Sequence, residues 1–150
     1  MKEVPIKNGS LFLVPLASGK FAIGVLLHAD GRGRSIGAFF GPAVDSSSDV
    51  EPIKLAIEDA KLVCRFGDHG LHTKRWQVIG AIPSWSESPW TALRFARLHD
   101  NPELKYVTEY DESLNVLSEQ LVPAVEAKGL PQDAQFGSGV VEAKLSKLIL

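Results

Sequence analysis

Residues 9–27 of the chain read GSLFLVPLASGKFAIGVLL, and this stretch decides the class of fold. It contains two apolar runs, Leu11–Leu16 and Phe21–Leu27, separated by the short turn Ala17–Lys20. Two apolar runs joined by about three to five residues that include a glycine predict a β-hairpin. The chain is therefore expected to be rich in β-structure from its first residues.

Features within and after this hairpin refine the expectation. Pro15 lacks an amide donor, so the first strand should be an edge strand or should end there, near a bulge. The second strand, Phe21–Ala29, is almost entirely apolar and should be central, with both faces of its sheet covered. Gly24 inside it indicates a bulge or a sharp bend, as small barrels need. The turn at 30–33 should lead into a third strand at Ser35–Phe40 and so complete a meander.

Farther along the chain, extended and helical apolar patterns alternate. A short helix is expected to begin with Asp49 as its N-cap and to run to about Ile57. The later strands are expected at Lys61–Phe66 and Trp76–Ile82, followed by a hairpin of Tyr106–Tyr110 with Ser113–Leu117. Further helices are predicted at Val122–Lys128 and at 139–150, whereas 91–99 fits either a helix or a strand.

Together these elements predict one α+β domain over residues 1–150. Its main element should be a strongly bent antiparallel β-sheet, or a partly open barrel, made by the first five or six strands. The short helix after the third strand and the C-terminal helix should pack on one side or close an open end. The side chains expected to be mainly buried are Leu11, Leu13, Phe21, Ile23, Val25, Leu27, Phe39, Val63, Trp76, Val78, Ile82, Leu145 and Leu148.

The composition limits the class of protein. The chain has 150 residues, 45% of them hydrophobic, which suits one folded domain with a proper core. Its net charge of −2 disfavours a nucleic-acid-binding protein, which needs a positive excess. Cys64 is the single cysteine, so no intramolecular disulfide can form and a reducing compartment is expected. The N-terminus lacks the apolar run of a signal peptide, and no run of about 18 apolar residues could cross a membrane. A cytoplasmic location without a membrane partner is therefore expected.

Few residues suggest chemistry. His69 and His72 beside Asp68 could contribute to a zinc site, but the third and fourth ligands have no evident source. Cys64 lies in an apolar run, and the adjacent Arg65 should point to the other face of the strand, so the thiol lacks an activating neighbour. We therefore expect no catalytic residue, no metal and no cofactor.

Two groups of residues are candidates for contact with a partner. Large aromatic residues in a polar loop near residues 84–90 either cap the core or anchor a protein partner. Residues 101–150 carry four basic and eight acidic side chains, which form either a solvated turn or a patch that attracts a basic partner. The candidate partner-binding residues are Trp85, Glu87, Trp90, Glu109, Asp111 and Glu112.

Three blocks of the sequence carry a resemblance to a known family. The first block is G-S-L-F-L-V-P-L-A-S-G-K-F-A-I-G at 9–24. The second comprises G-D-H-G-L at 67–71 and K-R-W-Q-V-I-G at 74–80, followed by Ile82 and Pro83. The third comprises G-L-P at 129–131 and G-S-G-V-V-E-A-K-L at 137–145. In their order and spacing these blocks resemble the immunity protein 26 family of bacterial polymorphic toxin systems.

The resemblance implies a single-domain α+β protein that neutralises a cognate protein toxin by binding it, without a cofactor or catalytic residues. It assigns no toxin-binding residue. An acidic C-terminal third would suit a toxin with a basic active-site cleft, as nucleases have. The alternative function is a small β-barrel module that binds nucleic acid or a peptide. An enzyme is the weakest hypothesis because no nucleophile, base and orienting group can be placed together.

Overall fold

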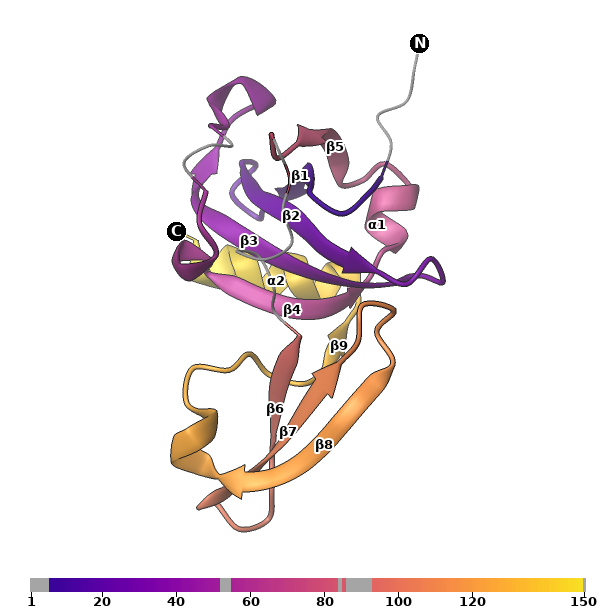
Figure 1. Ribbon diagram of the computed structural model, residues 1–150. Coiled ribbons are helices and arrows are strands. Elements are labelled where there is room, and N and C mark those ends of the chain that lie inside the picture. Colours follow the sequence, from indigo (N-terminus) through magenta and orange to yellow (C-terminus); the bar gives the residue numbers. More distant parts are fainter. Residues whose placement is uncertain (1–5, 52–54, 84, 86–92, 150) are drawn as a thin grey trace.

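The computed structural model describes residues 6–51, 55–83, 85 and 93–149 (Figure 1). It contains two β-sheets and a C-terminal helix, so the predicted α+β class is broadly correct. The large sheet has six strands in the order β5-β1-β2-β3-β4-β9, and the small sheet has three in the order β6-β7-β8. The prediction of a partly open barrel is wrong, because within the described residues the later strands β6–β8 pair among themselves and do not close the large sheet.

The large sheet is built on the predicted N-terminal hairpin. All its neighbouring strands are antiparallel except β9, which runs parallel to β4. β1 is not an edge strand, since it pairs with both β2 and β5, and Pro15 instead ends it. The strands are β1 (Ser10–Pro15), β2 (Phe21–Ala29), β3 (Arg34–Val44), β4 (Leu62–Gly67), β5 (Gln77–Ala81) and β9 (Gln135–Phe136).

The small sheet is a three-stranded antiparallel meander that projects below the large sheet in Figure 1. Its strands are β6 (Arg94–Leu98), β7 (Leu104–Tyr110) and β8 (Val116–Pro123). The ambiguous segment 91–99 is therefore a strand over its described part. The α-helices are α1 (His69–His72) and α2 (Ser138–Leu148), and short 3₁₀ turns are η1 (Ser47–Asp49), η3 (Ile57–Asp59) and η5 (Ala124–Ala127).

The large sheet is covered on both faces, as the apolar sequence of β2 predicted. On one face, aromatic rings pack against α2, which lies behind the sheet in Figure 1; Phe12 and Trp76 stack with their centroids 5.6 Å apart. On the other face, Val25, Leu27 and Ile36 pack with residues of the small sheet and its turn, namely Phe95, Tyr110 and Leu114. The small sheet is thus attached to the large one through a shared apolar core.

Gly24 is required by this packing and not by a barrel bend. A Cβ atom at position 24 would lie 2.3 Å from a ring carbon of Phe12 on the neighbouring strand. Real Cβ atoms do not approach other atoms so closely, so only glycine lets the Phe12 ring lie flat across β2. The ring then reaches the stacking position on Trp76.

Two predicted helices are wrong in their described parts. Asp49 is the last residue of η1 and is followed by the extended residue Val50, while Ile57 begins a separate 3₁₀ turn; residues 52–54 lie outside the described residues. Val122 belongs to β8, and only Ala124–Ala127 forms a 3₁₀ turn there. Pairing with β7 supplies hydrogen bonds along β8 and outweighs the local helical preference.

Most of the predicted core is correct. The predicted side chains that are buried are Leu11, Leu13, Ile23, Val25, Leu27, Phe39, Trp76 and Leu145. Those that are half-buried are Phe21, Val63, Val78 and Ile82. Leu148 is 51% exposed, so its prediction is wrong. The helix ends at this residue, and the extended Ile149 turns into the core in its place.

Candidate partner-binding surface

Trp85 lies over the start of the N-terminal hairpin. It is half-buried and packs against the core cluster shared by the two sheets. Gly9 has a φ of +87°, and a Cβ atom there would lie 2.7 Å from the Trp85 indole. This contact corresponds to the capping role foreseen for the tryptophans, whereas contact with a partner stays a prediction. Glu87 and Trp90 lie outside the described residues.

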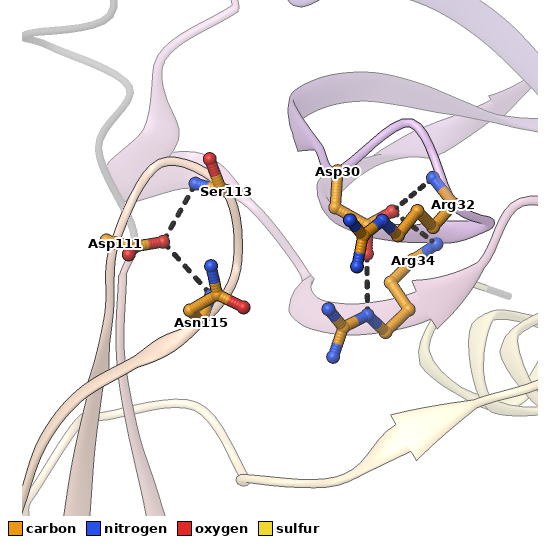
Figure 2. Close-up of polar contacts among 6 residues, drawn as sticks. All are labelled: Asp30, Arg32, Arg34, Asp111, Ser113 and Asn115. Carbon is orange, nitrogen blue, oxygen red and sulfur yellow. Dashed lines mark hydrogen bonds and ion pairs between the residues drawn. The ribbon is translucent and has the colours of Figure 1, made fainter.

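The Asp111 side chain accepts hydrogen bonds from the backbone of the turn between β7 and β8. The backbone amides of Ser113 and Asn115 donate hydrogen bonds to its Oδ1 at 2.9 and 3.0 Å (Figure 2). The turn holds Leu114 at a φ of 62° and leaves its side chain only 3% exposed, inside the shared core. Asp111 therefore shapes the turn that attaches the small sheet to the large one.

An aspartate carboxylate also accepts backbone amide hydrogen bonds in the turn between β2 and β3. There the amides of Arg32 and Arg34 donate to Asp30 Oδ1 at 2.7 and 3.1 Å, and Arg34 Nε donates to Oδ2 at 2.6 Å (Figure 2). Short polar side chains that accept nearby amide protons stabilise turns of this kind. In its turn Asp111 likewise accepts two amide protons at Oδ1, and its contact with a partner stays a prediction.

Glu109 and Glu112, although close in sequence, lie in different surroundings. Glu112 is exposed in the turn, whereas Glu109 is half-buried on β7. Glu109 also lines a cleft of about 610 Å³ that lies between the two sheets. Of the three acidic residues that the sequence singled out within the described part of the chain, Glu109 lines this cleft, and Asp111 and Glu112 do not.

The cleft has a mostly apolar lining. One wall comes from η3 and β4 of the large-sheet region, and the other comes from β6, β7 and the loop before β9. The apolar lining residues are Ile57, Ala60, Val63, Leu93, Leu130 and Pro131. A volume of this size lies within the range of about 300–1,000 Å³ that is typical of pockets for small ligands.

Three charged side chains line the cleft. Glu58 lies on the η3 wall. Glu109 of β7 and Arg94 of β6 lie on the other wall, at opposite positions in the strand register of the small sheet. Among the residues that the structure describes, none of these three side chains forms an ion pair or a hydrogen bond. The cleft therefore has two carboxylates and one guanidinium available for an incoming group. Glu58 gave no signal in the sequence that would separate it from other exposed acids.

A buried polar cluster holds the two walls together. Arg65 of β4 donates from Nη2 to Asp133 Oδ1 at 2.9 Å, and the Tyr110 hydroxyl of β7 donates to the same oxygen at 2.7 Å. The Arg65 guanidinium also lies 4.8 Å from the centre of the Tyr110 ring. Burial and the hydrogen bond to Asp133 raise the pKa of Tyr110 to about 12. We call these three residues the Asp133 cluster; it links the large sheet, the small sheet and the segment before β9.

Backbone hydrogen bonds fix the same segment against the small sheet. The Ala96 amide donates to the Pro131 carbonyl at 2.9 Å, and the Asp133 amide donates to the Ala96 carbonyl at 2.8 Å. One edge of the small sheet is thus covered along β6. Because both walls are tied by side-chain and backbone bonds, the cleft is formed before any partner binds.

The opposite edge of the small sheet carries exposed apolar side chains. Within the described part of the chain, β8 pairs only with β7, and Val116, Leu117 and Leu121 are 61%, 64% and 49% exposed. On the same sheet Arg97 lies 4.3 Å from the centre of the Tyr106 ring and pairs with Glu119 of β8. Sequence reasoning missed this surface because β8 was divided between a strand and a helix.

Cys64 and His72, which the sequence singled out for possible chemistry, lie in different surroundings. Burial raises the pKa of the Cys64 thiol to about 12, which keeps it protonated at neutral pH. His72 Nε2 lies 3.0 Å from Asp68 Oδ2, and within the described ranges no group of three or more histidine, cysteine or acidic residues is placed to hold a metal ion. No helix in those ranges is long and apolar enough to span a bilayer.

Comparison with known proteins identifies the family. The model of the family described as Immunity protein 26 matches residues 7–100, which is more than half of the chain and runs from before β1 to just after β6. No curated protein and no solved structure matches. The match does not reach the third block of the resemblance, at 129–145, which stays a prediction. On the strength of residues 7–100, this chain belongs to the immunity protein 26 family.

Proposed function

We propose that this protein is an immunity protein that binds a cognate bacterial toxin and neutralises it without chemical transformation. Membership of the immunity protein 26 family is the observation that carries the proposal. The preformed cleft between the sheets supports it, since a rigid concave surface can bind a partner at low entropic cost.

The ionisable groups of the described residues also favour binding over catalysis. Each group whose pKa is clearly shifted has a structural partner or is buried in the core: Asp30 in a turn, Cys64 in the core, Tyr110 in the Asp133 cluster, and Arg75 paired with Glu142. Catalytic sites instead gather perturbed groups around a space where a substrate can react. The cleft is lined by none of these shifted groups.

The charge distribution favours a toxin whose contact surface is basic. The last third of the chain has four basic and eight acidic side chains, and the cleft contains two carboxylates against one guanidinium. Complementary charge speeds the encounter of two proteins and rejects wrong partners. A nuclease, which has a basic cleft for its substrate, is one toxin class of this kind.

Co-expression tests the proposal. The protein encoded beside this gene is the candidate toxin, and its induction in a bacterial host should arrest growth. Co-expression of this chain should restore growth, and the two proteins should co-purify as a complex. The variant Asp133→Ala weakens the link between the sheets. Growth rescue by this destabilised variant is compared with growth rescue by the wild type. If growth is not restored although the immunity protein accumulates in soluble form, the proposed function is wrong for this pair.

A further inference from the structure

The cleft between the sheets combines three properties that point to one kind of ligand. It has an apolar lining, two carboxylates on opposite walls, and a formed shape. Glu58 comes from η3 beside the large sheet and Glu109 from β7 of the small sheet. A group that enters the cleft therefore meets negative charge from both sides and hydrocarbon between.

We propose that this cleft is a socket for an arginine side chain presented by a loop of the protein partner. A guanidinium is planar, always charged and weakly hydrated, so it tolerates apolar walls better than an ammonium group does. Its N–H groups form strong charge-assisted hydrogen bonds with carboxylates. Leu130 and Pro131 can cover the methylene stem of the side chain, as apolar surfaces do for long charged residues.

Arg94 does not cancel the charge of the socket. It lies directly opposite Glu109 in the small sheet and lines the same cleft. No ion pair joins Arg94 to Glu109 or to Glu58 in the described residues, and the three side chains leave a net charge of one negative unit. With two carboxylates and one guanidinium, the socket favours a positively charged group of the partner over a negatively charged one.

The socket lies at the border of the family match. Glu58 and Arg94 fall within the matched residues 7–100, whereas Glu109 and the loop 129–131 fall beyond them. The η3 and β4 wall and the β6 part of the other wall thus belong to the part of the chain that the family model describes, whereas Glu109 and the loop 129–131 belong to the remainder. This arrangement would let the remainder set which partner loop is accepted.

The inference rests on the proposed function for its biological meaning, but its test does not use the toxin. The probe is the peptide acetyl-Leu-Arg-Leu-amide, titrated into ¹⁵N-labelled full-length protein and followed by amide NMR. The control peptide has citrulline, a neutral isostere, in place of arginine. We expect the backbone amides of Glu58, Val63 and Glu109 to shift with a dissociation constant in the millimolar range, and the citrulline peptide to bind more weakly.

Charge-neutral variants assign the binding to the two carboxylates. Glu109→Gln and Glu58→Gln should each raise the dissociation constant about two- to fivefold, because both sites are open to water. Glu103→Gln is the matched control: this exposed residue precedes β7 at the end remote from Glu109, and its loss should leave binding unchanged. The amide spectrum of each variant reports its folding, and either glutamate variant alone suffices for the test.

Several results would overturn the socket. These are equal binding of the citrulline peptide, shifts confined to residues outside the cleft, no shifts up to about 10 mM peptide, or equal effects of Glu103→Gln and Glu109→Gln. If growth rescue succeeds while the peptide does not bind, the socket is wrong and the proposed function stands. If the peptide binds as expected while rescue fails, the socket stands and the proposed function is wrong.

Discussion

Replacing Asp133 by alanine should destabilise the protein more than its single carboxylate suggests. The Asp133 side chain is 6% exposed and its Oδ1 accepts hydrogen bonds from Arg65 and Tyr110. Arg65 Nε is buried and has no hydrogen-bond partner among the described residues, and the guanidinium is paired with Asp133 through Nη2. Asp133→Ala removes that anion and leaves a mostly buried positive charge uncompensated.

The expected size follows from the burial of the partner. Removal of one member of a buried ion pair costs about 3–5 kcal/mol. The Arg65 side chain is 18% exposed, and water can therefore relieve part of the cost. We expect the lower end of the range, about 3 kcal/mol in the free energy of unfolding. Tyr110→Phe, which keeps Arg65 paired, should cost only about 1 kcal/mol, the typical value of one hydrogen bond.

Urea unfolding followed by tryptophan fluorescence measures these differences, since Trp76 is fully buried. Asp45→Ala is the matched control: its side chain is 79% exposed and lies 3.9 Å from Lys20, so its loss should change stability by less than about 0.5 kcal/mol. A loss of under about 1 kcal/mol for Asp133→Ala would refute the reasoning. It would mean that the walls of the cleft are held mainly by the apolar core.

Other consequences of the packing can be measured on the same protein. Hydrogen bonding from Arg75 holds the pKa of Glu142 below its ordinary value of 4.5, so this carboxylate stabilises the fold above that pH and the contribution fades as pH falls further. Glu142→Gln should therefore be less stable than the wild type near neutral pH, with the difference shrinking in acid unfolding curves below about pH 4.5. Gly24→Ala should cost about 1–3 kcal/mol or more, since its Cβ would lie 2.3 Å from a ring carbon on β1. Gly139→Ala in α2, where nothing lies within 4 Å, should instead stabilise by about 0.5–1 kcal/mol, and equal effects at the two glycines would contradict this account. Cys64, 1% exposed, should react with a thiol reagent only after unfolding, and rapid labelling of the native protein would show that the thiol is accessible.

Local patterns predicted the N-terminal part of the fold well. The hairpin of β1 and β2 depends on apolar runs and a glycine turn that are contiguous in sequence, and β2 has the predicted limits Phe21–Ala29. The structural reason for a glycine at position 24 could not be predicted from such a local pattern. It depends on the Phe12 ring, and the cross-strand pairing of Phe12 with Gly24 appears only once the register is known.

Elements whose shape depends on distant partners were predicted less well. Residues 122–128 have a helical composition, but β7 recruits the first of them into β8. The Asp133 cluster joins residues 23 and 68 positions apart, a distance over which no sequence pattern signals a contact.

The candidate surface shows the same limit. The sequence analysis groups Glu109, Asp111 and Glu112 by their charge. In the structure, Asp111 accepts hydrogen bonds within its own turn, whereas Glu109 lines the cleft. Glu58 lies 51 positions before Glu109, and only the folded arrangement places both on one cleft. Composition thus predicts a basic partner, whereas the proposal that the partner binds at this cleft depends on the folded structure.

Titration of toxin activity with purified protein tests the central claim, neutralisation by binding, most directly. The toxin is held well above the dissociation constant and its residual activity is measured as this protein is added. We predict a linear fall that reaches zero near equal molar amounts, because each bound molecule blocks one toxin. Complete and lasting inactivation by a small fraction of an equivalent would contradict the account, since only a catalyst that modifies the toxin could produce it.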